Sequence, residues 1–206
     1  MKVIVPTTIA DITLGQYQSF DLISNNENTT ESELESAALR IFVGLTDEQI
    51  KAISQNDKEA LLKDITTAMN QKPVFDEKNL PTFKLKDTEF GFHNNLDSLS
   101  AGAYGDLMEY SGEVEDYHRL MAIVFRPITG KDMLGNYTIA EYNGTELWCE
   151  VMKQTPMHYV QSALFFFRNL AIELRKCTHK FSREVGHRKV AKQQIFGILT
   201  DGMPVS

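Results

Sequence analysis

Two Glu-x-x-His strings are the residues of this sequence best suited to metal chemistry, Glu115 with His118 in "EDYH" and Glu184 with His187 in "EVGH". Ferritin-like di-iron proteins present such a string from each of two helices, together with single glutamates from two others. The second string contains a glycine and lies in a basic segment, which is poor ground for a rigid ligand-bearing helix. We therefore predict no metal ligands, and a di-metal carboxylate protein is the weakest alternative.

A second group with chemical potential is Cys177 with His179 and His187, which has the residue types of half a metal site or of a nucleophile and its base. Cys149 and Cys177 are the only cysteines and lack the paired spacing of a zinc site. We interpret Cys177 as a packing residue. The glycines of "SAGAYG" lack the Lys-Ser/Thr ending of a phosphate-binding loop. The sequence thus predicts no catalytic residue, no cofactor and no enzymatic activity.

Charge is divided unevenly along the chain. The 206 residues are 42% hydrophobic and 24% charged, which is ordinary globular usage, and carry a net charge of −7. This acidic net charge argues against a general nucleic-acid binder. Residues 175–192 differ from the rest, because they carry a net charge of +6 and leave −13 on the other residues. The cations suit a solvated helix end, a contact with an acidic partner or DNA, or pairing between subunits. They are Arg175, Lys176, Lys180, Arg183, Arg188, Lys189 and Lys192.

The compartment follows from cysteine usage and hydropathy. Two cysteines are too few for a disulfide framework, which fits a reducing environment. Pro6 and Thr7 directly follow "MKVIV", so we expect no signal peptide. No run approaches the roughly 18 apolar residues of a membrane span. We predict a cytoplasmic protein without membrane contact.

Two of the helices expected in this chain follow a repeated residue pattern, which we call the echo. "TTIADITLGQY" (7–17) and "NNLDSLSAGAY" (94–104) share a pattern in which Thr13 and Ser100 each precede apolar residues at helical spacing. Each hydroxyl is predicted to cap a helix, and Ile12 or Leu99 to pack as the hydrophobic staple. Convergent capping and a true internal duplication both explain the echo.

Each copy is followed by an amphipathic helix that ends in an apolar run and a breaker, Gly44 in "ELESAALRIFVGLT" and Pro127 in "YHRLMAIVFRPIT". Two helical hairpins of similar plan are expected. Thr46 and Gln49 form a capping box before further helices that end ahead of Pro73. "TFKLKDTEFGFH" (82–93) alternates as a short β-hairpin does, and a minor strand is expected near Tyr137.

The last predicted helix runs from Thr155 and Pro156 through "MHYVQSALFFFRNLAIELRKC". A stripe that includes Val160, Ala163 and Phe167 suits a core, whereas three apolar side chains fall off it. Such a helix is either central in its own fold or buried against another chain. The off-stripe residues are Phe165, Phe166 and Ile172.

The predicted fold class is mainly α, with two helical-hairpin units, a long C-terminal helix and a small β-hairpin. Residues 1–181 are expected to form a single domain, with 1–72 and 82–181 as its two subdomains. Residues 182–206 are expected to form a basic, mobile tail, and its closing "GILTDGMPVS" (197–206) is either a mobile end or a short docking segment.

Four segments carry a family resemblance: "VPTTIADITLGQYQSF", "EFGFHNNLDSLSAGAYGDL", "HRLMAIVFRPIT" with "YTIAEYNGT", and "ALFFFRNLAIEL". In this order, over most of residues 3–176, the chain resembles tail assembly chaperone-like and virion-associated proteins in the structural gene blocks of tailed bacteriophages. Each segment is a packing and capping pattern rather than a catalytic signature. Residues after 181 do not match.

The resemblance implies a non-enzymatic role in tail morphogenesis, in the host cytoplasm or in the virion. A tail assembly chaperone coats the apolar, helical tape measure protein, which requires exposed apolar grooves. The alternative is a stoichiometric virion protein of a connector, baseplate or inner capsid, with permanent interfaces. Partners would be tail or other virion proteins, or a second copy. The residues predicted to line the groove are Leu45, Phe125, Phe165, Phe166 and Ile172.

Overall fold

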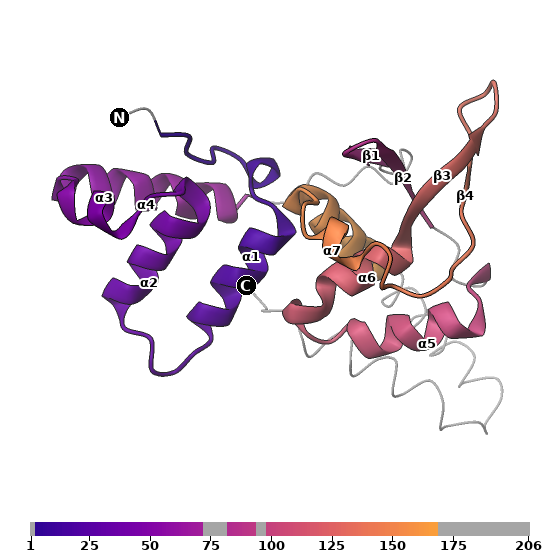
Figure 1. Ribbon diagram of the computed structural model, residues 1–206, viewed down its shortest axis with the longest axis horizontal. Helices are drawn as coiled ribbons and strands as arrows, with labels where there is room; N and C mark the ends of the chain where they lie inside the picture. The colour runs from indigo at the N-terminus through magenta and orange to yellow at the C-terminus, as the bar shows by residue number, and fades with distance from the viewer. Residues whose placement is uncertain (1–2, 72–81, 94–97, 169–206) are drawn as a thin grey trace, which may run out of the picture.

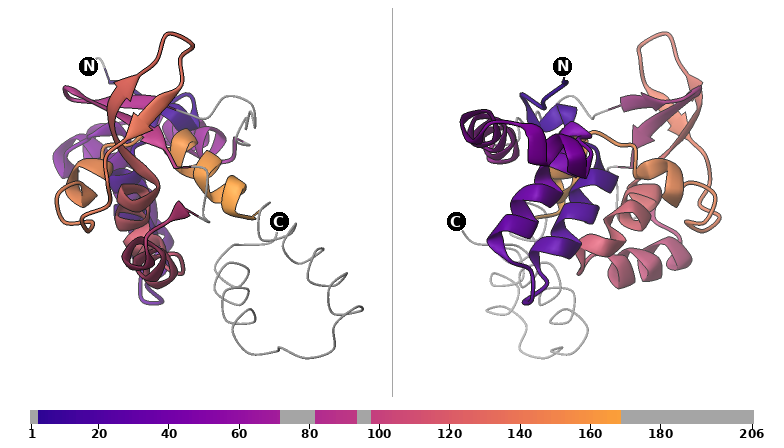
Figure 2. Two further views of the ribbon diagram at one scale, coloured as in Figure 1. Left: turned by 90° about the vertical axis from the view of Figure 1, so that its right-hand side faces the viewer. Right: turned by 60° about the vertical axis from the view of Figure 1, so that its left-hand side comes forward.

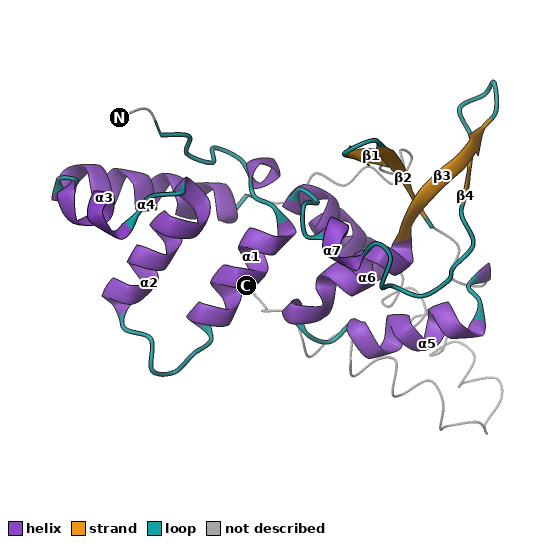
Figure 3. Cartoon of the chain, viewed as in Figure 1, coloured by secondary structure: helices purple, strands orange, loops and turns teal. Residues whose placement is uncertain are grey.

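The computed structural model of the chain describes residues 3–71, 82–93 and 98–168 (Figure 1). The fold is mostly helical and includes a four-stranded antiparallel sheet in the order β1-β2-β3-β4. Helices α1 to α4 form one side of the molecule, and the sheet with α5, α6 and α7 forms the other (Figure 3). The predicted predominance of helix is confirmed. The fold is α+β, with more sheet than the single small hairpin predicted.

The first side consists of short helices that begin at hydroxyl caps. The caps predicted at Thr13 and Thr46 are confirmed, each as a capping box with the glutamine three residues on. Gly44, at a φ of 75°, ends the helical segment over residues 31–43 as predicted, because this left-handed conformation suits glycine. The elements are η1 (Ile9–Asp11), α1 (Leu14–Ser24), α2 (Glu31–Ala38), its π-helical extension η2 (Leu39–Val43), α3 (Asp47–Ala52) and α4 (Gln55–Met69).

The sheet contains the predicted hairpin and two further strands. Its strands are β1 (Thr82–Leu85), β2 (Thr88–Phe92), β3 (Phe125–Lys131) and β4 (Tyr137–Ile139). The strand expected near Tyr137 is confirmed as β4. β2 pairs with β3 with Phe92 opposite Phe125 and Phe90 opposite Pro127.

The prediction of a helix that continues up to Pro127 is wrong beyond Val124. Helix α6 (Tyr117–Val124) ends there, and Phe125 begins β3. The physical reason is that a residue before proline, here Arg126, disfavours helical backbone, while the edge of β2 offers hydrogen bonds to an extended segment.

Helix α5 (Ala101–Tyr110) begins at the cap predicted for Ser100, whose hydroxyl accepts from Ala103 N at 3.2 Å. Helix α5 packs on α6, much as α1 packs on α2. Thereafter the two copies diverge, because α2 continues to Val43 whereas α6 passes directly into a strand. The shared feature of the echo is therefore the helix start. The remaining elements are η4 (Val114–Asp116), α7 (Cys149–Met152) and a helix over residues 157–168.

Both sides of the molecule contribute to one cluster of buried apolar side chains. Three backbone hydrogen bonds fix the start of α1 to the segment after α7. Leu14 N donates to Thr155 O at 2.8 Å, Gly15 N to Lys153 O at 2.7 Å, and Met157 N to Ile12 O at 2.8 Å. Backbone hydrogen bonds thus join the start of α1 to the segment after α7, although Leu14 and Cys149 are 135 residues apart in the sequence.

Candidate functional site

Two of the residues predicted to line an apolar groove are core residues instead. Leu45 is 4% exposed and Phe125 is fully buried, which corrects the prediction for both. The Leu45 N–H donates to the Leu39 carbonyl at 3.3 Å, so the chain folds back over the helix end after Gly44. The ring of Phe125 lies 4.8 Å from that of Phe83 and 5.0 Å from that of Phe92, between centroids, inside the sheet's buried face.

The last described helix behaves largely as its pattern predicts. Val160, Ala163 and Phe167 are buried, as predicted for these members of the core stripe. Phe166 is half-buried and meets Phe92 edge-on, at 5.1 Å between ring centroids. Phe165 is 38% exposed. Ile172, the seven cations of the basic segment, and Cys177, His179, Glu184 and His187 lie outside the described residues.

The β3–β4 hairpin forms an arm that extends away from the rest of the described chain (Figures 1 and 2). At its tip Met133 is 97% exposed and Leu134 is 88% exposed. This exposed pair was not among the residues predicted from the sequence. Its signal is present, because "DMLGN" places two large apolar residues inside a turn of Asp, Gly and Asn, where polar residues are usual.

Hydrogen bonds to one carboxylate order the tip of this arm. Asp132 Oδ1 accepts from Leu134 N at 2.9 Å and from Asn136 N at 2.8 Å, and its Oδ2 accepts from Asn136 Nδ2 at 2.7 Å. These bonds, the one from the Asn136 side chain first, lower the pKa of Asp132. Gly135, at a φ of 86°, completes the turn. The two apolar side chains are therefore presented by a structured turn.

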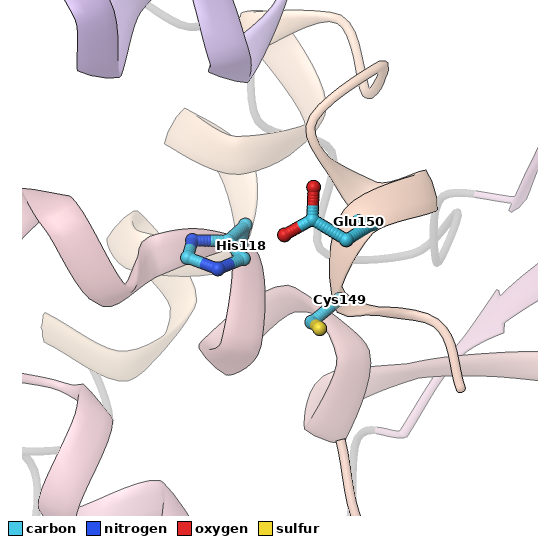
Figure 4. Close-up of side chains that lie close together, drawn as sticks. All are labelled: His118, Cys149 and Glu150. Carbon is cyan, nitrogen blue, oxygen red and sulfur yellow. The ribbon is translucent and has the colours of Figure 1, made fainter. Parts of the chain in front are cut away.

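A second candidate site lies between α6 and α7. One possible ligand atom from each of His118, Cys149 and Glu150 lies within 4.8 Å of the other two (Figure 4). The structure thus brings His118 together with residues 31 and 32 positions away in sequence, and Glu115, its partner in the predicted string, is not part of this group. The cluster forms because α6 packs on α7, so the local sequence "WCE" (148–150) could not predict it.

His118 is buried and fixed from the side of α1. Gln18 Nε2 lies 3.1 Å from His118 Nδ1 and donates to the carbonyls of Val114 and Glu115, each at 2.8 Å. Burial, with the positive charge of Lys153 second, lowers the pKa of His118. This shift favours the neutral imidazole, which is the form that binds metals and accepts protons.

The other two members of the cluster are more accessible. Glu150 is held by Lys153, whose Nζ lies 2.8 Å from Oε1 and 3.0 Å from Oε2, and this contact lowers the pKa of Glu150. The thiol of Cys149 is half-buried and donates to the Glu146 carbonyl at 3.7 Å. A buried imidazole, a thiol and a carboxylate thus converge beside one lysine.

A cleft of about 1060 Å³ adjoins this cluster, and His118 and Lys153 are part of its wall. The other walls come from α1 and from the segment between α5 and α6. Three acidic side chains against one lysine make it a polar, acidic cleft: Asp21, Glu113 and Glu115. Burial raises the pKa of Asp21, and Glu113 adds to the shift.

Comparisons of the chain with protein-family models, with curated proteins and with solved structures found no match. Within residues 3–71, 82–93 and 98–168, no helix is long and apolar enough to cross a membrane. Two local features of the described residues could support a function: the apolar tip of the arm, and the cluster formed by His118, Cys149 and Glu150.

Proposed function

We propose that this protein is a non-enzymatic assembly factor of a bacteriophage tail, which acts in the host cytoplasm and binds apolar helical segments of a tail protein. The family resemblance supports the phage setting. The observation that carries the binding role is the arm, whose tip holds Met133 and Leu134 almost fully in water.

The tip is suited to capture an apolar partner. Scattered exposed apolar residues are common, but two adjacent large ones on a projecting, hydrogen-bonded turn expose apolar surface that a partner can cover. Methionine is unbranched and polarizable, so it adapts to varied apolar surfaces. Since a tip of two side chains buries little area, each contact is weak and reversible, as a factor that releases its client requires.

An amphipathic helix is the partner that suits the tip best, because its apolar positions recur along one face and offer successive two-residue sites. The exposed Phe165 and half-buried Phe166 remain candidates for a second contact on the helix over residues 157–168. Ile172 and the basic segment remain predictions.

The direct test is co-expression of the full chain with the tape measure protein of the same phage, with co-elution and soluble yield of the tape measure protein as readouts. We expect the Met133→Ser, Leu134→Ser double variant to lose co-elution while retaining its own fold. Leu147→Ser, which alters a 75% exposed leucine away from the arm, is the matched control and should bind normally.

Equal co-elution of the double variant and the native chain would remove the arm from the proposal. Absence of any complex with the native chain would contradict the proposed client.

A further inference from the structure

We propose that His118, Cys149 and Glu150 form a binding site for a divalent cation of the zinc class. Imidazole, thiolate and carboxylate are the three protein ligand types that Zn²⁺ accepts, and the mixed set favours a borderline ion over Mg²⁺ or Ca²⁺. The site is separate from the arm and does not depend on the proposed assembly function.

The geometry needs only a small contraction. In a tetrahedral zinc site with bonds of about 2.0–2.3 Å, ligand atoms lie about 3.3–3.8 Å apart. The three candidate atoms already lie within 4.8 Å of one another. The exposed Glu150 side chain is free to supply most of the movement by changing rotamer, because only the contact with Lys153 holds it among the hydrogen bonds of the described residues.

The imidazole is oriented in advance, as metal-binding histidines are. Gln18 contacts Nδ1 at 3.1 Å and is itself fixed by the Val114 and Glu115 carbonyls. Such outer hydrogen bonds fix ring orientation and normally raise metal affinity.

Lys153 acts as the competitor for the metal. Its ammonium group occupies both carboxylate oxygens of Glu150, at 2.8 and 3.0 Å, so a cation must displace it. Both Lys153 and His118 line the cleft of about 1060 Å³, and the displaced lysine has room there. A three-ligand site beside a cleft also leaves a fourth coordination position for water or a further ligand.

The test is titration of the metal-free, reduced full chain with Co²⁺ and then Zn²⁺. Cobalt bound to a thiolate gives charge-transfer absorption in the near ultraviolet, which reports the Cys149 ligand directly. We expect saturation at one Co²⁺ per chain, displacement by Zn²⁺, and a rise in Tm on zinc addition. Absence of the charge-transfer band in the native chain would overturn the proposal.

Variants assign the site. Cys149→Ser should abolish the charge-transfer band and Glu150→Gln should weaken zinc binding about tenfold or more, whereas Lys153→Met should strengthen it. Cys177→Ser, which alters the only other cysteine, is the matched control and should retain the band. Both altered ligands are accessible, so these variants avoid the folding risk of replacing the buried His118. A band that survives Cys149→Ser but is lost in Cys177→Ser would refute the assignment.

Discussion

The side-chain amide of Gln18 lies 3.1 Å from Nδ1 of His118, across 100 residues of sequence, and thereby joins α1 to α6. The same amide donates to the carbonyls of Val114 and Glu115. One polar side chain of α1 thus holds this helix to the segment that leads into α6.

Replacing this amide should destabilise the fold. We expect Gln18→Ala to lower the free energy of unfolding by about 1–3 kcal/mol, because it leaves the partly buried Val114 carbonyl without this donor. Gln55→Ala is the matched control, since the Gln55 amide donates to the exposed Glu59 side chain and its loss should change stability by less than about 0.5 kcal/mol. Urea denaturation followed by circular dichroism measures both. Equal effects of the two variants would contradict the bridging role.

The two glycines of the echo should respond oppositely to alanine. A Cβ at Gly15 would lie 3.1 Å from the Lys153 carbonyl oxygen, which is already fixed by its hydrogen bond from Gly15 N, whereas a Cβ at Gly102 meets nothing within 4 Å. We expect Gly15→Ala to destabilise by about 1 kcal/mol or more through this crowding. Gly102→Ala should stabilise by about 0.4–1 kcal/mol by restricting the unfolded chain.

Thermal and urea unfolding of the two variants give this comparison directly. Stabilisation by Gly15→Ala would show that α1 does not approach the Lys153 segment as closely as the structure has it.

Tyr137 and Gly91 make a second close approach. A Cβ at Gly91 would lie 2.4 Å from Tyr137 Cε2, and the Tyr137 hydroxyl donates to the Phe92 carbonyl at 3.1 Å. We expect Gly91→Ala to cost about 1–3 kcal/mol, because the ring must leave this position. In the double variant with Tyr137→Ala the added cost of the alanine at 91 should shrink, and a double-mutant cycle measures that coupling. Additive costs would contradict the contact.

Stability should fall in mild acid through His158. Burial lowers the pKa of this imidazole, and its Nδ1 is buried without a hydrogen-bond partner within the described residues. A histidine whose folded pKa lies below its unfolded value of about 6.5 favours the neutral form, so its contribution is present above that pH and is lost as the pH falls.

The check is the difference in unfolding free energy between the native chain and His158→Gln from pH 7.5 to pH 5. We expect the native chain to lose more stability over this range than the variant. Parallel curves would mean that His158 takes up no extra proton on unfolding.

Asp132 should determine the order of the arm but little of the global stability. Asp132→Ala removes the acceptor of three hydrogen bonds at the exposed tip, so amide exchange at Leu134 and Asn136 should become faster. The free energy of unfolding should change by less than about 1 kcal/mol, because the tip is solvent-exposed. Hydrogen exchange resolved by NMR measures both effects, and unchanged exchange at the tip would contradict the role of Asp132.

Local features of the fold were predictable, because capping and alternation are properties of adjacent residues. Thr13, Thr46 and Ser100 begin helices as expected, and the hairpin of β1 and β2 forms where its pattern lies. The transition at Phe125 was not predicted, since an apolar run ahead of Pro127 suits a helix end as well as a strand. Phe125 starts a strand because β2, more than 30 residues earlier in the sequence, provides an edge with which β3 pairs.

The candidate sites were less accessible from sequence. The sequence pattern did not predict that Leu45 and Phe125 are buried, because their burial depends on tertiary packing. The cluster of His118, Cys149 and Glu150 needs α6 and α7 to meet. The apolar pair Met133 and Leu134 was visible in the sequence, but its exposure depends on how far the β3–β4 arm extends from the body.

The central claim, a tail assembly factor that leaves its client, is tested most directly by quantitative mass spectrometry of gradient-purified particles beside the infected-cell lysate. We expect peptides of this chain, such as "HRLMAIVFRPITGK", to be abundant in the lysate and absent from the particles. A fixed copy number in every particle would contradict it and would make the protein a stoichiometric virion component.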